Sequence, residues 1–243
     1  MHRASKPVAE DRLEADRDFH WRGGDVSRIE GLSDGVFALA IALLAIQQAV
    51  PSRYERLLEL LRELPAFALC FAFLAWCWFQ HFRFFRRYGA QDAWTFVLNA
   101  ALLAAVLAFV YPLRFFSSML VTGPLFYGGV GRGPDGSMGG SPALMTFYTA
   151  AFVAIFGLFF LLNRHAWSHR ARYELDEVET ELARAEMRMH LISVGIGALA
   201  LGLSLAGRTA LAGYTFFLLG PAHGLHGSAT YRRVGRLKQT VAE

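Results

Sequence analysis

The chain has 243 residues, of which 54% are hydrophobic, 14% are aromatic and only 18% are charged. Soluble domains typically carry about 25% charged residues, which they need to cover an apolar core. The composition therefore argues against an ordinary soluble protein. The formal charge of +4 does not indicate a nucleic-acid partner, because the basic residues gather at the ends of apolar segments.

Six stretches of the chain contain no Asp, Glu, Lys or Arg, and each is 17 to 27 residues long. An α-helix needs roughly 20 apolar residues to cross about 30 Å of hydrocarbon. One such stretch fits a buried helix of a soluble protein. Six of them predict an all-α integral membrane protein with six transmembrane helices per protomer, in contact with a lipid bilayer. These stretches are 35–52, 64–82, 93–113, 137–163, 191–207 and 209–231.

The basic residues divide unevenly between the two sides that six crossings would create. One side holds 18 of the 24 Lys and Arg residues, and the positive-inside rule places that side in the cytoplasm. We therefore expect a multi-pass protein of the cell (plasma) membrane with both termini cytoplasmic. The predicted divisions are a cytoplasmic N-terminal segment at 1–34, a six-helix transmembrane domain at 35–231 and a cytoplasmic basic tail at 232–243.

The first apolar stretch is preceded by a polar motif. Ser27 and Glu30 have the spacing of a capping box, which would start a helix before the apolar run and place Ser33 and Asp34 inside it. An acidic residue at the edge of the hydrocarbon is a candidate for function, because burying its charge is costly. Alternatively, Ser33 or Asp34 is simply the N-cap of the spanning helix.

An apolar stripe follows along the same helix. Leu39, Ala42 and Ile46 are spaced i, i+3 and i+7, so they share one helical face. Such a stripe usually faces lipid or a neighbouring helix. The alternative is a hydrophobic constriction along a pore, which can gate by excluding water. Spacing alone does not favour the pore.

Two later segments have their own polar patterns. In 164–190, Glu177 and Glu181 precede Arg184 and Arg188 at helical spacing, which predicts a solvated helical extension that serves as a polar connector. The glycine-rich stretch 123–142 is typical of an external loop.

A histidine pair lies in the sixth stretch. His223 and His226 follow Pro221, which we expect to kink or unwind the helix. A His-x-x-His pair can bind a metal or carry protons, but no third ligand is evident nearby. We therefore predict that the two histidines satisfy backbone carbonyls freed by the proline, with no metal and no cofactor.

The motif of the first helix resembles that of a known channel family. Arg28, three residues, and then Leu32-Ser33-Asp34 resemble the Arg-x-x-x-Phe-Ser-Asp signature of the lysosomal potassium channel, transmembrane protein 175, and its bacterial homologues. The likeness covers the first three apolar helices and continues in Gly35-Val36-Phe37-Ala38, in the Trp-x-x-His of Trp78 and His81, and in Asn99 with a downstream Pro112.

The resemblance implies a cation channel subunit that conducts potassium, possesses no enzymatic activity and assembles as a homotetramer. In that family the first helices line the pore, and hydrophobic residues five, eight and twelve positions after the motif Asp form the constriction. Those positions are Leu39, Ala42 and Ile46 in this chain. The resemblance also implies that Arg28, Ser33 and Asp34 hold the cytoplasmic half of the helix, with Trp78, His81 and Asn99 as polar partners.

Two departures from the family pattern bear on selectivity and packing. Leu32 replaces the signature Phe, and Ala42 stands where many bacterial members carry Thr. A hydroxyl at that level can coordinate a cation or orient its water, whereas a methyl cannot. We therefore expect weak preference for potassium over sodium.

Other functions and other roles for these residues remain open at this stage. A proton- or ion-coupled secondary transporter would need a titratable residue at mid-membrane depth, but His81, His223 and His226 all lie towards the ends of their stretches. A membrane enzyme would need clustered His, Asp or Glu, and no such cluster is evident. Trp78 and His81 also fit an interfacial aromatic belt with a snorkelling histidine.

Overall fold

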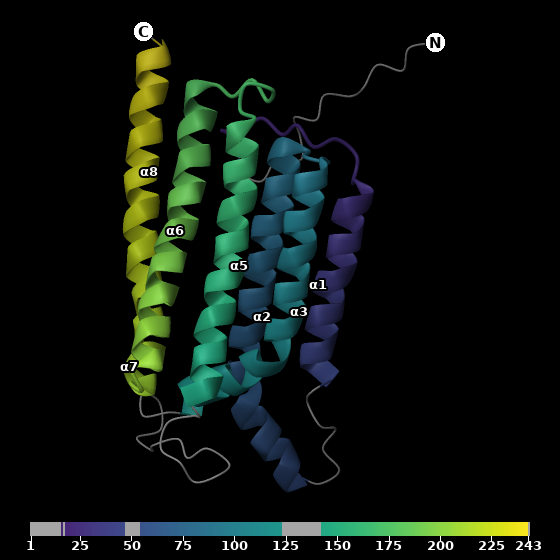
Figure 1. Ribbon diagram of the computed structural model, residues 1–243, viewed down its shortest axis with the longest axis vertical. Helices are drawn as coiled ribbons and strands as arrows, with labels where there is room; N and C mark the ends of the chain where they lie inside the picture. Colours follow the sequence, from purple (N-terminus) through teal and green to yellow (C-terminus); the bar gives the residue numbers. More distant parts are fainter. Residues whose placement is uncertain (1–15, 17, 47–53, 123–141, 243) are drawn as a thin grey trace.

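The computed structural model describes residue 16 and residues 18–46, 54–122 and 142–242, and these segments form helices with no strand among them. Their order along the chain is shown in Figure 1. The elements are α1 (Arg28–Ile46), α2 (Tyr54–Tyr88), α3 (Ala93–Thr122), α5 (Pro142–Ser168), α6 (Glu177–Leu205), α7 (Thr209–Thr215), the 3₁₀ turn η2 (Phe216–Leu218) and α8 (Leu219–Ala242).

The first five charge-free stretches correspond to helices that are long and apolar enough to cross a membrane. Their bounds are Arg28–Ile46, Leu64–Tyr88, Ala93–Val110, Pro142–Ser168 and Glu177–Leu205. The prediction of an all-α, multi-pass membrane protein is therefore confirmed. Of the expected loop at 123–142, residues 123–141 lie outside the described part of the chain.

The sixth stretch is helical but interrupted. It forms α7, η2 and the first half of α8 in place of one regular helix. Pro221 explains the break, because proline cannot donate to the carbonyl four residues earlier and its ring crowds that carbonyl. The backbone forms a tighter 3₁₀ turn at Phe216–Leu218, shortly before Pro221.

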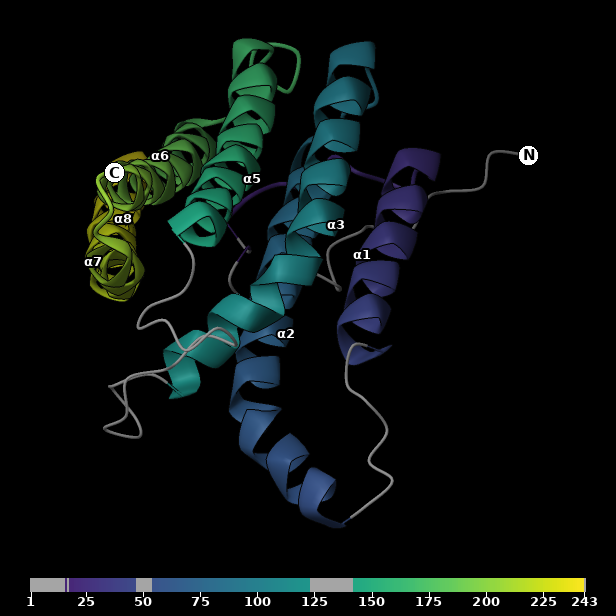
Figure 2. The ribbon, with the colours of Figure 1, turned by 60° about the horizontal axis from the view of Figure 1, so that its bottom comes forward.

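The helices form two groups that meet along α3, α2 and α5. In one group α1 packs on α2 and α3, and in the other α6 packs on α5 and on α8. Figures 1 and 2 show α1 at one edge of the bundle and α8 towards the opposite edge. The contact between the groups is aromatic: Phe73 of α2 lies 5.5 Å from Phe109 of α3 and 6.3 Å from Phe156 of α5, between ring centroids.

Acidic caps start two of the helices. Asp176 and Glu179 form a reciprocal capping box, so α6 begins at Glu177 and the segment is helical from there, as expected. The expectation that it is solvated is wrong, because Glu179 is buried. Asp92 accepts hydrogen bonds from the backbone of Thr95 and from His165 of α5. Partial burial acts to raise the pKa of Asp92, but the hydrogen bonds from Thr95 and the charge of His165 outweigh it and lower the pKa to about 2.

Close helix packing constrains one glycine of α6. A Cβ added at Gly197 would lie 2.8 Å from Phe152 Cδ1 and 2.9 Å from Val153 Cγ2 of α5, and the branched Val153 side chain has little freedom to move. Two residues earlier, Gly195 has nothing within 4 Å of its added Cβ. Substitutions at these two positions therefore distinguish the cost of overpacking from the gain in helix propensity.

We predict that Gly197→Ala lowers the melting temperature of the detergent-solubilised protein, because overpacking costs about 1–3 kcal/mol. Gly195→Ala is the matched control, and it should leave the melting temperature unchanged or raise it, since Ala favours helix by about 1 kcal/mol over Gly. Equal shifts for the two variants would contradict the close packing of α6 on α5.

Candidate functional site

The start of α1 is set by the predicted capping box. The Glu30 N–H donates to Ser27 Oγ at 3.2 Å, and the Ser27 N–H donates to Glu30 Oε2 at 3.3 Å. Ser33 and Asp34 therefore lie inside the helix, and the alternative in which one of them is the N-cap is wrong. Glu30 is itself buried and pairs with Arg86 of α2 at 2.7 Å.

A directional chain of buried hydrogen bonds ties α1 to α3 and α2. The Ser33 hydroxyl donates its one proton to the Ile29 carbonyl at 2.8 Å, so it accepts from Asn99 Nδ2 at 2.9 Å. This bond orients the Asn99 amide and leaves its Oδ1 to accept from His81 Nε2 at 2.8 Å. His81 therefore carries its proton on Nε2. We call these three residues, His81, Asn99 and Ser33, the polar chain.

A second bond joins the motif to α2. Trp78 Nε1 donates to Asp34 Oδ1 at 2.9 Å, and the Trp78 ring stacks on Phe82 with centroids 5.7 Å apart. Because His81 is fully buried, the alternative of a snorkelling histidine does not fit. The structure thus brings Trp78, His81 and Asn99 onto the motif, whereas Arg28 and Leu32 lie exposed on α1.

The apolar stripe lies on the opposite side of α1 from these bonds. Leu39 is 51% exposed and Ile46 is 76% exposed, and Ala42 between them is also exposed. The buried apolar residues of α1 are instead Phe37, Ala40 and Leu44, which pack towards α2 and α3. The rotation of α1 therefore presents the stripe away from the rest of the described chain.

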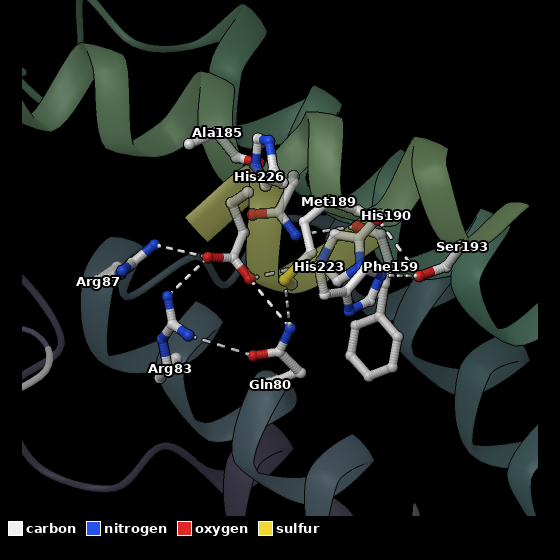
Figure 3. Close-up of polar contacts among 12 residues, drawn as sticks. Gln80, Arg83, Arg87, Phe159, Ala185, Met189, His190, Ser193, His223 and His226 are labelled. Carbon is white, nitrogen blue, oxygen red and sulfur yellow. Dashed lines mark hydrogen bonds and ion pairs between the residues drawn. The ribbon is translucent and has the colours of Figure 1, made fainter. Parts of the chain in front are cut away.

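A second polar feature, which the sequence did not predict, is a largely buried group of ion pairs at the basic end of the bundle. Glu186 of α6 accepts from Arg83 at 2.6 Å, from Arg87 at 3.3 Å and from Gln80 at 3.0 Å, all on α2 (Figure 3). Arg87 also forms a close ion pair with buried Asp16 of the N-terminal segment. We call Asp16, Gln80, Arg83, Arg87 and Glu186 the ionic cluster.

The residues after Asp16 extend this connection. Phe19 is fully buried beneath Arg87, whose guanidinium carbon lies 4.7 Å from the centroid of the Phe19 ring. Arg22 pairs with Glu179 of α6 at 2.7 Å. A signal for the cluster exists in the sequence, because Arg83 and Arg87 share a face of α2 at i, i+4 spacing. Because the sequence predicts a polar connector at 164–190, it does not indicate Glu186 of α6 as the acidic partner of these arginines.

The histidines of α8 contact α6. His226 Nε2 donates to the Ala185 carbonyl at 2.9 Å, and His223 Nε2 lies 3.0 Å from Ser193 Oγ (Figure 3). The prediction that both satisfy carbonyls freed by Pro221 is therefore wrong, because their partners belong to another helix. His190, which the sequence analysis did not single out, is buried and stacks on Phe159 with centroids 5.4 Å apart.

Metal binding has no support in these contacts. Within the described segments, no group of three or more His, Cys, Asp or Glu residues is placed to hold a metal ion. Cys70 and Cys77 are buried among apolar side chains, and neither forms a disulfide within the described segments.

Comparison with known proteins identifies relatives over nearly the whole chain. Residues 28–110 match the model of the family described as "Endosomal/lysosomal potassium channel TMEM175". A potassium channel of Marivirga tractuosa is 32% identical over 236 residues, covering 91% of this chain and 94% of the relative. A potassium channel of Chamaesiphon minutus is 32% identical over 105 residues, covering 40% of this chain and 52% of the relative.

The fold agrees with a solved structure of the same family. A crystal structure of a variant of the potassium channel MtTMEM175, in complex with a nanobody–MBP fusion protein, superposes with a TM-score of 0.73 at 32% identity. The match covers 88% of this chain and 97% of the solved chain. The matched segment 28–110 contains α1, α2 and the apolar part of α3, and thus the motif, its polar partners and the stripe.

We predict that Asn99→Leu lowers the unfolding free energy by about 1–2 kcal/mol, because it leaves the buried His81 N–H without an acceptor. Denaturant or thermal unfolding in detergent would measure the loss. Asn163→Leu on α5 is the matched control, since Asn163 is also buried but its Nδ2 donates only to Phe159 in its own helix. Equal losses would contradict a specific role for the polar chain.

We predict a larger loss, about 3–5 kcal/mol, for Arg87→Met, which leaves the Asp16 and Glu186 carboxylates undercompensated in a buried site. Adding Asp16→Asn should restore part of the stability, because it removes one of the two stranded charges. Arg232→Met, at an exposed arginine of α8, is the control and should change little. Strictly additive losses in the double variant would argue against the ion pair.

Proposed function

The chain belongs to the TMEM175 family of potassium channels, and we propose that it is a subunit of a homotetrameric potassium channel in the plasma membrane. In this proposal the α1 helices line the pore, and Leu39, Ala42 and Ile46 form its hydrophobic constriction. The observation that supports this best is the exposed apolar face of α1, whose rotation is fixed by polar bonds on its other side.

The position of α1 favours an assembly. Within the described segments α1 packs mainly on α2 and α3, so α1 of one protomer does not enclose a path by itself. Copies of the protomer arranged around an axis beside α1 would bring their stripes together, so that the apolar side chains form stacked rings around that axis. From Leu39 to Ile46 these layers would extend about 10 Å along the pore, long enough to exclude water when narrow.

The motif has a mechanical role in this proposal. Asp34 and Ser33 hold α1 to α2 and α3 through Trp78 and Asn99, so they set which residues face the axis. Exposed Arg28 lies at the entry of the same helix, where its charge meets water and lipid headgroups. The motif thus positions the constriction without itself needing to contact the ion.

The orientation follows from the distribution of charge. The ends of α2 and α8 and the start of α6 lie at the same end of the bundle as the ionic cluster (Figure 1). Most of the basic residues belong to this end, which we assign to the cytoplasm together with both termini. Family membership favours a channel over the coupled transporter, and potassium is the proposed ion.

We predict that Leu39→Asn raises potassium flux from proteoliposomes several-fold, because a polar side chain lowers the cost of wetting the constriction. Leu199→Asn on α6 is the matched control, since Leu199 is 52% exposed, close to the 51% of Leu39. The control should conduct as the wild type does. Flux that is the same in both variants and in the wild type would sink the assignment of the stripe to the pore.

We predict that Ala42→Thr increases the preference for potassium over sodium, because a hydroxyl at this level can coordinate a partly dehydrated cation. Reversal potentials under opposed potassium and sodium gradients would measure the change, which should move towards the potassium equilibrium potential. Ala104→Thr, at an exposed position of α3, controls for the added hydroxyl. Identical potentials for the wild type and Ala42→Thr would remove Ala42 from the selectivity-determining layer.

A further inference from the structure

A pocket of about 650 Å³ opens between the end of α5 and the first half of α6, on residues that the proposed pore does not use. One part of its lining is apolar, with Phe160, Met187 and Leu191. The other part is strongly basic, with four arginines around Trp167. These arginines are Arg164, Arg170, Arg184 and Arg188.

The indole of Trp167 organises the basic part. The guanidinium carbons of Arg170 and Arg184 each lie 5.1 Å from the ring centroid, one from the segment after α5 and one from α6. Cation–π contacts of this kind fix the guanidinium without using its N–H donors. Arg170 also donates a long hydrogen bond of 3.5 Å from one guanidinium nitrogen to the Trp167 carbonyl. The two side chains are thus held together, and each keeps further N–H groups that can bind an acceptor.

The charge of the pocket is largely uncompensated. Among the described residues that line it, none is acidic. Arg188 pairs with Glu181 at 2.5 Å, but no carboxylate of the described segments forms an ion pair with Arg164, Arg170 or Arg184. Like charges gathered in this way favour an anionic ligand, and arginine binds phosphate with two parallel hydrogen bonds.

The pocket is divided in the same direction as the membrane. On α5 the charge-free stretch ends at Arg164, and on α6 it begins at Leu191. Leu191 and Phe160 therefore lie on the hydrocarbon side of the pocket, and the arginines lie at the level of the headgroups. A free anion would gain nothing from the apolar wall, and a neutral lipid would gain nothing from the charge of the arginines. A ligand that contacts both parts has an anionic group and an apolar chain.

We infer that this pocket binds one anionic phospholipid from the basic leaflet. The lipid phosphate lies against Arg164, Arg170 and Arg184, and the start of an acyl chain lies against Phe160, Met187 and Leu191. Basic pockets between transmembrane helices commonly hold anionic headgroups in this manner. Lipid binding at this pocket does not depend on whether the stripe of α1 lines a pore.

The test compares phosphatidylglycerol with phosphatidylcholine on the full chain in detergent, by native mass spectrometry of retained lipid. The wild type should prefer phosphatidylglycerol, and Arg164→Gln with Arg184→Gln should reduce this preference roughly tenfold. Arg232→Gln with Arg236→Gln removes the same charge from α8 and should keep the preference. An equal loss in both double variants would mean diffuse attraction to the membrane face and would overturn the site.

Two further measurements distinguish loss of the site from misfolding, and lipid binding from binding of a soluble anion. Leu191→Trp keeps every charge but obstructs the apolar wall, and Leu191 is 48% exposed, so the substitution is sterically tolerated. It should also reduce phosphatidylglycerol binding, and unchanged binding would overturn the site even if the arginine variant does not fold. Inorganic phosphate should not displace the lipid, since displacement at millimolar concentration would identify a soluble anion site instead.

Discussion

The hydrogen bond between Asn99 and Ser33 determines how α1 is rotated, and the rest of the proposed site depends on that rotation. Helices within lipid gain little from hydrophobic association, because lipid tails are as apolar as the side chains. Packing of Phe37, Ala40 and Leu44 alone would tolerate small rotations of α1. Directional bonds do not, since turning the helix would leave buried donors without acceptors.

The ionic cluster fixes the other half of the molecule in the same way. Buried charges are costly to desolvate, so Glu186 and Arg87 are stable there only while they compensate one another. Their pairing joins α2 to α6 and, through Asp16, to the N-terminal segment. Arg188, two residues after Glu186, faces the proposed lipid pocket, so a single turn of α6 contributes to both.

Local patterns in the sequence were sufficient for the parts of the fold that depend on neighbouring residues. Charge-free length predicted the membrane helices, and the spacing of Ser27 and Glu30 predicted the start of α1, because each signal lies within one helix. The family signature then indicated Trp78, His81 and Asn99 as partners of the motif. The stripe itself was ambiguous, since lipid-facing and pore-facing residues are equally apolar.

Contacts between distant helices could not be derived in this way. Arg87 and Glu186 are 99 residues apart, and no helical period relates them. The charged residues of 164–190 predict a solvated connector because charge usually marks exposure. In the structure Glu186 and His190 face inwards, because α6 packs on α5 and Glu186 pairs with arginines of α2. The partners of His223 and His226 were misjudged for the same reason, since the position of α8 against α6 is a property of the assembled bundle.

Exposure alone does not distinguish the stripe of α1 from the face of α6 that carries the proposed lipid pocket. The exposed residues of α1 and those of α6 are similarly apolar, and either set would be stable against lipid. What separates them is the constraint behind each face. The α1 stripe lies opposite the polar contacts that hold α1 to α2 and α3, whereas the pocket beside α6 contains arginines held by Trp167. The stripe of α1, which is apolar and fixed in its rotation, is suited to line a water-excluding path. The pocket beside α6, which combines charge with an apolar wall, is suited to hold a lipid.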